Sequence, residues 1–462
     1  MSTKREKEQQ VGSAQSGDQG PLQLTGCTLS WPGRPEMERR LTALPQYQLI
    51  ADYEESTRWE EARHALIEGD NLAALAALQG PLSGAAKLIY LDPPYNNKRD
   101  LLYRDDSGTS PREGASDPRS RWLSFIYPRL VLARSLLRED GFICASIDDQ
   151  ELPTLRLLMD EIFGQTARLA TFIWETKRAA RGVPPRSMVM STHEYLLCYG
   201  RDPRLSKLAG LPRDDADFSN PDEDPRGPWR SESMNSTGRR GREFTITDPE
   251  SGHQFKGRWA FSEEKVEAMI RAGLVLFPKS KRGVPRQKKH QNSYRNPNKA
   301  GTSMLGWHST ESATRALMRL FDGEKIFSFP KPQSLLRTLL AQSCAGDDLI
   351  IDLFAGSGSM GAAVIEENRD RGSALRSLSV QIPEPFDPLR PGNEAAGRLC
   401  AQRGSPPLIS TLTRERLRRV LKQSDGRGAG IGEGLRSFRL TEGDPPSPPH
   451  LQTFFAPSDF SS

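Results

Sequence analysis

Short apolar runs alternate with amphipathic stretches over much of the first 200 residues and again from about 310 to 385. The runs are too short for helices and end in turn-forming residues, so they predict buried strands at 87–91, 142–147, 171–174, 193–199, 349–354 and 378–382. Apolar positions at helical spacing predict helices at 72–78, 122–138, 152–163, 311–321, 333–342, 360–368 and 413–422. This alternation is typical of an α/β fold on a mostly parallel sheet.

The alternation stops in the middle of the chain, where Pro, Gly and Arg residues are frequent. We therefore expect an inserted region at 200–320 between two halves of one core, at 21–199 and 321–390. Residues 1–20, rich in Lys, Gln, Ser and Gly, are expected to form a disordered lead-in. The Pro-, Arg- and Gly-rich residues 391–462 are expected to form a C-terminal extension.

The tetrad Asp92-Pro93-Pro94-Tyr95 directly follows the expected strand at 87–91. A carboxylate at the carboxyl end of a parallel strand lies where open α/β sheets bind ligands. Successive prolines fix φ and lack amide donors, so their carbonyls are held stiffly. Asp92 and a proline carbonyl could accept the two hydrogens of a base amino group, while Tyr95 offers a ring on which a flipped base can stack. A strand followed by a proline turn explains the tetrad equally well when it is taken alone.

A second strand end carries a glycine loop that suits a nucleotide-like cofactor. The strand at 349–354 leads into Asp352-Leu353-Phe354-Ala355-Gly356-Ser357-Gly358. Gly356 and Gly358 permit a tight turn and a close backbone approach. Together the two motifs indicate methyl transfer to the amino group of a base, provided that the two strand ends meet in one crevice.

The same loop also fits a dinucleotide-binding pattern, because Gly361 completes G-x-G-x-x-G. Such a site would want an acidic residue roughly 20 positions further on for the ribose. The chain offers Gln381 there, at the end of the next strand, which can still bond a ribose diol. A dehydrogenase would also leave the proline tetrad without a role, so methyl transfer is favoured.

Composition narrows the compartment and the chemistry. The chain has 462 residues, enough for two or three domains, and five cysteines without C-x-x-C spacing, which indicates reduced thiols in a cytoplasmic protein. No run of about 18 apolar residues is present, so no membrane span is expected. His193 and Glu194 could suggest a metal, but no second histidine follows at helical spacing. We expect a strand start there and no metal.

Positive charge is concentrated inside the expected insertion. Residues 226–300 hold 17 Lys and Arg against 7 Asp and Glu, interleaved with aromatic residues, in a chain whose formal net charge is +5. A solvated surface is the plain explanation, but the position between two chemical motifs favours contacts with a phosphate backbone. The candidate nucleic-acid contacts are Arg239, Arg240, Arg258, Lys281, Arg282, Lys288 and Lys289.

These motifs, in this order, resemble those of β-class adenine-specific (N6) DNA methyltransferases, whose permuted sequences place the catalytic tetrad before the cofactor loop. The similarity is greatest to the modification (Mod) subunits of type III restriction–modification systems. It covers residues 47–440, is weakest in the insertion, and rests on 67–72, 88–95, 127–130, 146–149, 158–164, 193–195, 329–332, 352–358 and 380–385.

The resemblance implies a circularly permuted Rossmann-like methyltransferase fold, with a mostly parallel sheet of approximately seven strands and an inserted target-recognition region. It implies that Asp92, Pro93, Pro94 and Tyr95 hold the adenine N6, with Asp92 and the Pro94 carbonyl as acceptors. It implies S-adenosylmethionine as methyl donor and no metal, with cofactor contacts from Asp70, Lys331, Asp352, Phe354, Ala355, Gly356, Gly358 and Gln381.

Within that set, Gln381 would meet the cofactor ribose, Asp70 its adenine and Lys331 its methionine carboxylate. From the residues alone, a helix N-cap is as good an explanation for Asp70, and a surface lysine remains open for Lys331. Two departures from the family pattern are Asn97 in place of a threonine and Ser359-Met360 in place of a threonine pair. Neither removes a required group.

We therefore expect a site-specific adenine-N6 DNA methyltransferase of a restriction–modification system. The expected partners are double-stranded DNA, a restriction (helicase/nuclease) subunit and a second copy of the chain. Methylation of cytosine N4 in DNA or of RNA remains an alternative, as does a non-catalytic DNA-recognition subunit. Asp92 favours adenine, since the cytosine enzymes usually begin this tetrad with serine. The sequence leaves the recognition site and the oligomeric state open.

Overall fold

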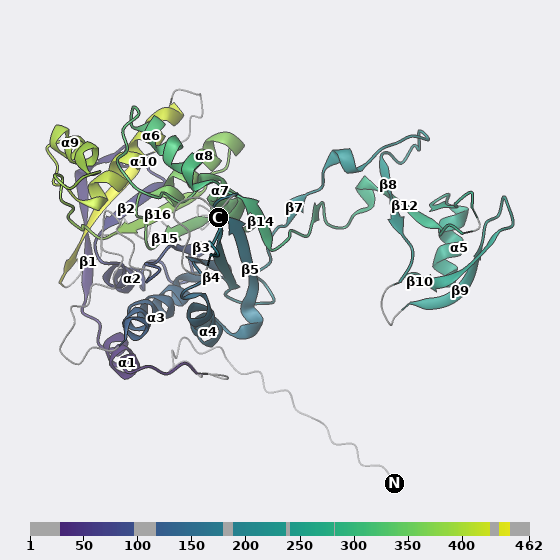
Figure 1. Ribbon diagram of the computed structural model, residues 1–462, viewed down its shortest axis with the longest axis horizontal. Helices are drawn as coiled ribbons and strands as arrows, with labels where there is room; N and C mark the ends of the chain where they lie inside the picture. Colours follow the sequence, from purple (N-terminus) through teal and green to yellow (C-terminus); the bar gives the residue numbers. More distant parts are fainter. Residues whose placement is uncertain are drawn as a thin grey trace, which may run out of the picture. The chain divides into compact units, whose positions relative to one another are not determined.

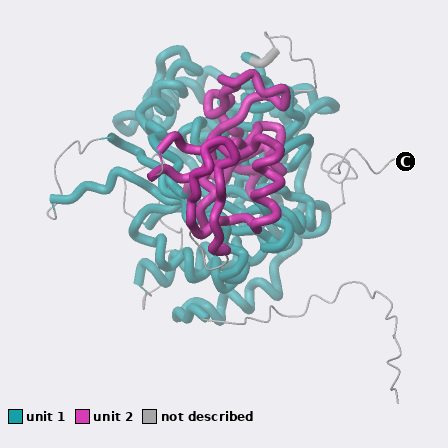
Figure 2. Tube along the Cα trace, turned by 90° about the vertical axis from the view of Figure 1, so that its right-hand side faces the viewer, with its two compact units in different colours: residues 1–207, 303–462 teal, residues 208–302 magenta. Residues whose placement is uncertain are grey.

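The computed structural model describes residues 28–96, 117–178, 188–236, 241–280, 282–425 and 434–443. It divides into two compact units, the first comprising residues 1–207 and 303–462 and the second residues 208–302 (Figure 2). The insertion expected at 200–320 is therefore shorter at both ends. The expected lead-in at 1–20 lies outside the described residues.

The first unit is built on a sheet that has ten strands in the described part of the chain (Figure 1). In spatial order they are β1 (Tyr47–Thr57), β17 (Leu435–Glu442), β2 (His64–Glu68), β16 (Arg376–Gln381), β15 (Leu349–Asp352), β3 (Ala86–Leu91), β4 (Leu137–Ile147), β6 (His193–Gly200), β5 (Arg168–Glu175) and β14 (Met304–Trp307). The sequence led us to expect approximately seven strands, and the described part of the sheet has ten, with β1 and β14 at its edges.

The strands from β17 to β4 are parallel, whereas β6 runs antiparallel to both of its neighbours. β1 is antiparallel to β17, and β14 is parallel to β5. The mostly parallel α/β fold expected from the sequence is confirmed. The described part of the C-terminal extension expected at 391–462 contributes a strand to the core, because β17 lies inside the sheet between β1 and β2.

Helices cover both faces of the sheet (Figure 1). They are α1 (Arg34–Thr42), α2 (Asn71–Leu78), α3 (Pro118–Leu136), α4 (Leu152–Phe163), α6 (Thr310–Leu320), α7 (Gln333–Ser343), α8 (Ser359–Arg371), α9 (Glu394–Gln402) and α10 (Ile409–Asp425), with a 3-10 turn, η1 (Gln165–Ala167), after α4. Alternation in β2 separates the two layers. Ala65 and Ile67 pack with α2 and α3, while Leu66 packs with α8 and α10.

The pairing of β3 with β15 brings the two sequence motifs together. The strands are parallel neighbours, with Ile89 beside Ile351 and Tyr90 beside Asp352. Their carboxyl ends therefore open on the same edge of the sheet, one leading into the tetrad and the other into the glycine loop. The expected meeting of two strand ends some 260 positions apart is confirmed.

The second unit is a small α/β assembly with its own core. It contains β7 (Leu211–Pro212), η2 (Asp215–Asp217), β8 (Trp229–Ser233), β9 (Arg242–Thr247), β10 (Gln254–Trp259), α5 (Glu263–Arg271), β11 (Val275–Leu276), β12 (Arg286–His290), η3 (Gln291–Ser293) and β13 (Asn298–Lys299). α5 packs Val266 and Met269 against Phe255 and Trp259 of β10. The same unit contains a polar core in which Lys288 pairs with Asp222 and Asp224.

Candidate active site

The tetrad sits at the end of β3 with its acidic and aromatic side chains turned to each other. Asp92 keeps 26% of its side chain exposed, whereas Tyr95 is buried. The Tyr95 hydroxyl lies 3.1 Å from both Asp92 Oδ1 and Glu194 Oε2, so it can donate to either carboxylate. Burial raises the pKa of Tyr95 well above its usual value, so the phenol stays protonated and remains a donor.

The Pro94 carbonyl already has a donor. Trp122 Nε1, from α3, donates to Pro94 O over 2.6 Å. No described residue donates to the Pro93 carbonyl. The structure therefore favours Pro93 as the acceptor for a substrate amino group, and it gives Pro94 the task of anchoring the turn. The Pro94 carbonyl retains a second lone pair, so its expected role as an acceptor for the base stays a prediction.

Lys331 balances two carboxylates at this site. Its Nζ lies 2.8 Å from Glu194 Oε2 and 3.2 Å from Asp92 Oδ1, and it donates to the Tyr95 hydroxyl. Burial by itself would lower the pKa of Lys331, but the two neighbouring carboxylates outweigh it and raise that pKa. The ammonium group also lies 4.7 Å from the Tyr95 ring centroid and 5.6 Å from that of Trp174.

The pKa of Asp92 reports the same balance. Burial raises it most, Lys331 lowers it, and the charge of Glu194 raises it again. Lys331 thus favours the ionised form of a carboxylate that its surroundings would otherwise protonate. Sequence reasoning placed Lys331 at the cofactor carboxylate and treated Glu194 as part of a strand start, so it missed this cluster. A carboxylate in the predicted strand at 193–199 was the available signal.

Two side chains of α10 form hydrogen bonds to the glycine loop. Gly356 and Gly358 have φ of +51° and +76°, which other residues rarely adopt, so the turn into α8 depends on them. Thr413 donates its hydroxyl to the Gly356 carbonyl over 2.5 Å. Arg416 donates from Nη1 to the Ser357 hydroxyl over 2.8 Å. These contacts fix the loop without using its outward face.

Asp352 supplies a buried carboxyl beside this loop. Burial, with a contribution from the charge of Asp92, raises the pKa of Asp352 to about 7, although the Phe354 N–H donates to Oδ1 over 3.1 Å. No described residue donates to its second oxygen. A buried, half-ionised carboxyl of this kind is poised to accept a hydrogen bond from a ligand or to face a cationic centre.

Two other predicted cofactor contacts are occupied within the protein. Asp70 caps α2 by accepting from Leu72 N at 2.9 Å, and it pairs with Arg129 at 3.0 Å, so the N-cap explanation is confirmed. The Gln381 side-chain oxygen accepts from Gly356 N at 2.7 Å. In this state Gln381 braces the glycine loop instead of presenting its amide to a ribose.

One cavity joins the two motifs. Its walls come from the end of β3, the segment before α7 and the glycine loop, through Tyr90, Asp92, Phe327, Phe329, Pro330, Lys331, Asp352, Phe354, Ala355, Gly356, Ser357, Ser359 and Met360. The lining combines aromatic surface, backbone amides, two acids and a cation. These groups can contact an aromatic base, a cationic centre and an amino-acid carboxylate, and the cavity that they line has a volume of about 40 Å³.

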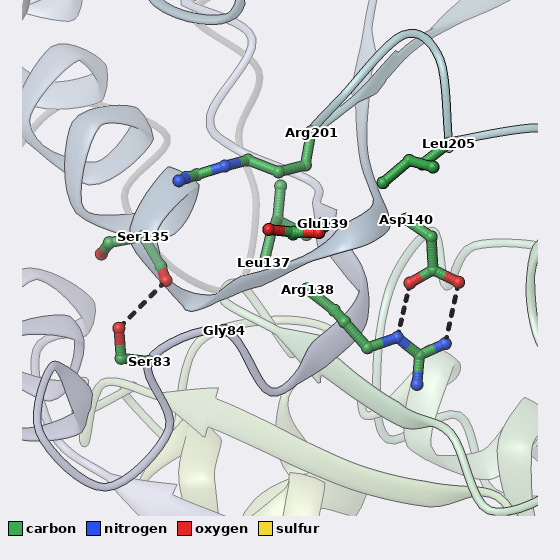
Figure 3. Close-up of a pocket in the computed structure, with 9 residues that line it drawn as sticks. All are labelled: Ser83, Gly84, Ser135, Leu137, Arg138, Glu139, Asp140, Arg201 and Leu205. Atoms are coloured by element: carbon green, nitrogen blue, oxygen red, sulfur yellow. Dashed lines mark hydrogen bonds and ion pairs between the residues drawn. The ribbon is translucent and has the colours of Figure 1, made fainter. Parts of the chain in front are cut away.

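A wider hollow in the first unit lies away from this chemistry. It is lined around the start of β4 by Ser83, Gly84, Ser135, Leu137, Arg138, Glu139, Asp140, Arg201 and Leu205 (Figure 3). Within it, Arg138 and Asp140 are paired, with Nε 2.5 Å from Oδ1. Leu137 is the first residue of β4, so this hollow adjoins the amino end of the strand, opposite to the ligand edge.

The residues proposed to contact nucleic acid fall into three groups. Arg239, Arg240 and Lys281 lie outside the described residues. Arg258 and Arg282 are exposed, and Lys289 is half-buried with Nζ 5.1 Å from the Tyr294 ring centroid.

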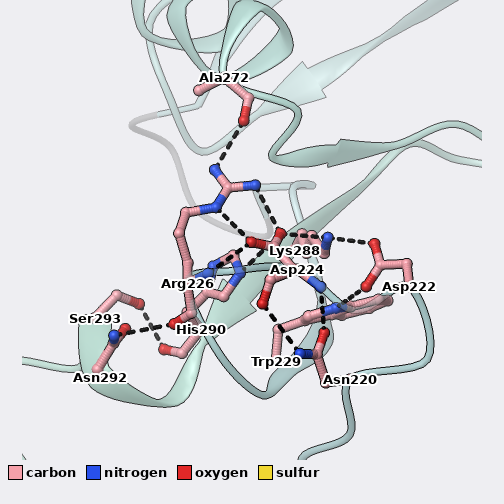
Figure 4. A network of polar contacts seen from close by, with 10 residues as sticks. All are labelled: Asn220, Asp222, Asp224, Arg226, Trp229, Ala272, Lys288, His290, Asn292 and Ser293. Carbon is pink, nitrogen blue, oxygen red and sulfur yellow. Dashed lines mark hydrogen bonds and ion pairs between the residues drawn. The ribbon is translucent and has the colours of Figure 1, made fainter.

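Lys288 is instead part of a polar core in the second unit (Figure 4). It is only 5% exposed and pairs with Asp222 and, at 2.5 Å, with Asp224. Arg226 and His290 converge on the same Asp224 carboxylate, at 2.7 and 3.1 Å. Lys288 is therefore not available as a surface cation, contrary to the sequence-based expectation.

Metal-ligand geometry does not occur in the part of the chain that the structure describes, where no group of three or more His, Cys, Asp or Glu could hold an ion. The ring of His193 engages the Tyr195 hydroxyl at 2.8 Å. No helix among the described residues has the length and apolarity needed to cross a bilayer.

A mostly parallel sheet that joins an acidic Pro-Pro-aromatic strand end to a glycine loop defines the amino-methyltransferase class of α/β proteins. Residues 86–384 match the N6/N4 methyltransferase family, described as DNA methylase. The chain belongs to this DNA methylase family.

Relatives of this chain include subunits of restriction–modification enzymes. The chain is 29% identical to the Mod subunit of the type III enzyme StyLTI from Salmonella typhimurium, a match that covers 80% of this chain and 59% of that protein. It is 26% identical to the Mod subunit of the type III enzyme EcoP15I from Escherichia coli, covering 91% and 73% respectively. The chain thus spans about three fifths of the first of these relatives.

Among solved structures, the PvuII DNA methyltransferase (cytosine-N4-specific) is similar over 78% of this chain and 93% of that one. The sequence identity is 12% and the TM-score is 0.39. The strand order and pairing of the sheet carry the assignment of the fold.

Proposed function

We propose that this chain transfers a methyl group from S-adenosylmethionine to the N6 amino group of adenine in double-stranded DNA. The observation that carries the proposal is the pairing of β3 with β15, which opens Asp92 and the glycine loop into one cavity. The cofactor, when bound, supplies an electrophilic methyl group on a cationic sulfur. The remaining chemistry belongs to the residues of the chain.

Asp92 and the Pro93 carbonyl would accept the two N6 hydrogens of an adenine that has left the helix, at a cost of a few kcal/mol for its unstacking. Holding both hydrogens orients the nitrogen lone pair toward the methyl group, so the gain comes from position. Positive charge then develops on N6. The ionised form of Asp92, which Lys331 favours, would stabilise that charge and accept the proton that N6 loses once the methyl group is attached.

The cofactor would occupy the cavity with its methionine and sulfonium groups near the two acids and Lys331. Asp352 and the backbone of the loop at Gly356 would meet it, with Phe354 as apolar surface. Lys331 lines the same cavity and keeps its ammonium group 3.2 Å from Asp92 Oδ1. Gln381 would have to exchange its bond to Gly356 for one to the ribose.

The second unit is proposed as the target-recognition region, since residues 208–302 contain most of the basic segment found in the sequence. The named relatives are subunits of type III restriction–modification enzymes. We therefore propose a role in restriction–modification, with a restriction subunit as partner and a second copy of the chain as a further one. Light scattering of the purified chain, alone and with a candidate restriction subunit, tests both associations.

The catalytic proposal is tested with the purified full chain, methyl-labelled S-adenosylmethionine and duplex DNA of mixed sequence. Nucleoside mass spectrometry should find N6-methyladenine. N4-methylcytosine alone would assign the other amino group, and modification of RNA but not of DNA would reject the substrate. Asp92→Ala should abolish methylation while calorimetry still detects cofactor binding. Glu54→Ala, which removes an exposed carboxylate from β1, is the matched control and should remain active.

A further inference from the structure

A two-stranded antiparallel ribbon in the second unit presents one polar face to solvent. β9 and β10 pair residue by residue, from Thr247 beside Gln254 to Arg242 beside Trp259. Among the described residues the two strands form a sheet of their own, and Trp259 makes an isolated antiparallel bridge to Asn235 outside it. One face of the ribbon is therefore defined by alternate positions of each strand.

The inner face of this ribbon is used mainly in packing. Ile246, Phe255 and Trp259 belong to a buried cluster with Val266 and Met269 of α5. The Trp259 indole donates to the Phe244 carbonyl over 2.9 Å, which ties the two strands together. The ribbon is thus a rigid support with its apolar side covered by α5, and only the other side can receive a partner.

The outer face carries hydrogen-bonding side chains at every second position. Gln254, Lys256 and Arg258 are all exposed and lie in one row along β10. Opposite them in register stand Thr247, Thr245 and Glu243, which are exposed as well. Arg258 Nε donates to the Gly241 carbonyl over 3.1 Å, which orients its guanidinium group. The face has no large apolar residue, so an apolar protein partner is a poor match.

This row has the chemistry that distinguishes bases in the major groove. A glutamine amide pairs with adenine N6 and N7, and arginine or lysine pairs with guanine O6 and N7. The major groove is about 12 Å wide and admits a two-stranded ribbon. Alternate residues of a strand are about 6.8 Å apart, which equals two base pairs at roughly 3.4 Å each. Further cationic lining beside β10 comes from Arg282.

We propose that the outer face of the β9–β10 ribbon enters the major groove of duplex DNA and determines sequence specificity through Gln254, Lys256 and Arg258. The inference rests on the proposed function, to which it adds the recognising residues and the groove. It makes a specific statement about the target sequence. Purines recognised by neighbouring members of the row should be about two base pairs apart.

The first experiment selects bound molecules from a random-sequence duplex library with the full chain and S-adenosylmethionine. The wild type should enrich one motif. Gln254→Ala and Arg258→Ala should each lose the preference at one position and bind the enriched site roughly 5- to 150-fold more weakly. Lys265→Ala removes an exposed cation from α5, which covers the opposite side of the ribbon, and should select the original motif with wild-type affinity.

Gln254→Glu separates recognition from any loss of folding. A carboxylate accepts from cytosine N4, so this variant should select a different base at the position that glutamine reads. A changed preference cannot come from a damaged protein. An unchanged motif in the Gln254 and Arg258 variants, at wild-type affinity, would overturn the proposal, and so would a wild type that enriches no motif.

The second experiment identifies the groove with modified versions of the enriched site. Replacing its recognised purines by 7-deaza analogues removes the N7 acceptor from the major groove, and binding should weaken. Replacing guanine by inosine removes the N2 amino group from the minor groove, and affinity should change little. The reverse result would place recognition in the minor groove and reject the ribbon. An enriched motif without any methylation would instead reject the proposed activity and leave the ribbon supported.

Discussion

Among the described residues of the site, Lys331 is the only cation that pairs with the carboxylates of Asp92 and Glu194. Replacing Lys331 by methionine would remove this positive charge. The methionine fills a similar volume, so the change is mainly electrostatic. Lys331 Nζ lies 3.2 Å from Asp92 Oδ1 and 2.8 Å from Glu194 Oε2. Without the ammonium group, Asp92 faces Glu194 and the buried surroundings alone.

The attraction at 3.2 Å amounts to about 5 kcal/mol at an effective dielectric constant of about 20. Most of this is offset by the cost of withdrawing both charges from water, and the 26% exposure of Asp92 screens the pair further. We expect a net loss of about 1–2 kcal/mol for the ionised form of Asp92, which corresponds to a roughly 5- to 30-fold slower reaction on the acidic limb of the rate profile, where this carboxyl is mostly protonated.

The sign of the pH effect follows from the same geometry. Lys331 lowers the pKa of Asp92, so the methionine variant has a higher pKa at this residue. Because the ionised carboxylate is the active form, the acidic limb of the rate profile should move to higher pH, and activity should recover as the pH rises. Single-turnover methylation of duplex DNA between pH 5.5 and 9.5, at saturating cofactor, measures this limb.

Two companion variants make the experiment decisive. Lys331→Arg keeps the charge and should retain the wild-type acidic limb, while Lys325→Met removes an exposed lysine just upstream and should change nothing. An acidic limb that stays in place in Lys331→Met would refute the charge-balancing role. A higher KM for the cofactor together with an unmoved limb would return Lys331 to the role first expected, at the methionine carboxylate.

Three further outcomes follow from the structure. Burial keeps the pKa of Asp352 near 7, above its value in the unfolded chain, so the protein loses about 2–4 kcal/mol of stability as the pH rises from 4 to 7. Urea melts of Asp352→Asn should show a smaller loss of stability over this pH range. A loss equal to that of the wild type would contradict the raised pKa. Lys288→Met should lower the unfolding midpoint of the second unit, because it removes one of the cations that pair with the buried Asp224. It should not flatten the salt dependence of DNA binding, as the loss of a phosphate contact would. Trp122→Phe removes the hydrogen bond to the Pro94 carbonyl, and its loss should cost about 1 kcal/mol. We expect kcat/KM to fall by up to about tenfold. An unchanged kcat/KM would mean that the turn does not depend on that hydrogen bond.

The sequence predicted the central strands well because their apolar runs are continuous. β3 and β15 are buried along almost their whole length, as expected for strands covered on both faces. Four strands of the sheet, β1, β17, β2 and β14, were not predicted. β1 mixes exposed acidic residues with apolar ones, and β17 follows a Gly-rich stretch, so neither shows a clear run.

The site divides in a similar way. Asp92 and Asp352 were predicted because their local sequence shows a strand end and a turn. Glu194 and Trp122 were not, since their contact with the tetrad depends on how β6 and α3 pack against the end of β3, which no local pattern records. Lys288 was misassigned because a run of cations hides the alternation of β12, in which every second residue points inward.

The spatial order of the sheet has a consequence for synthesis of the chain. Among the described residues, the last three strands in the chain are β15, β16 and β17, and all of them insert between strands made much earlier. Until residue 381 has been synthesised, β2 and β3 each have an edge without a neighbouring strand. Unpaired strand edges promote association with other chains. A nascent chain interrupted before residue 349 should therefore depend on chaperones and aggregate without them.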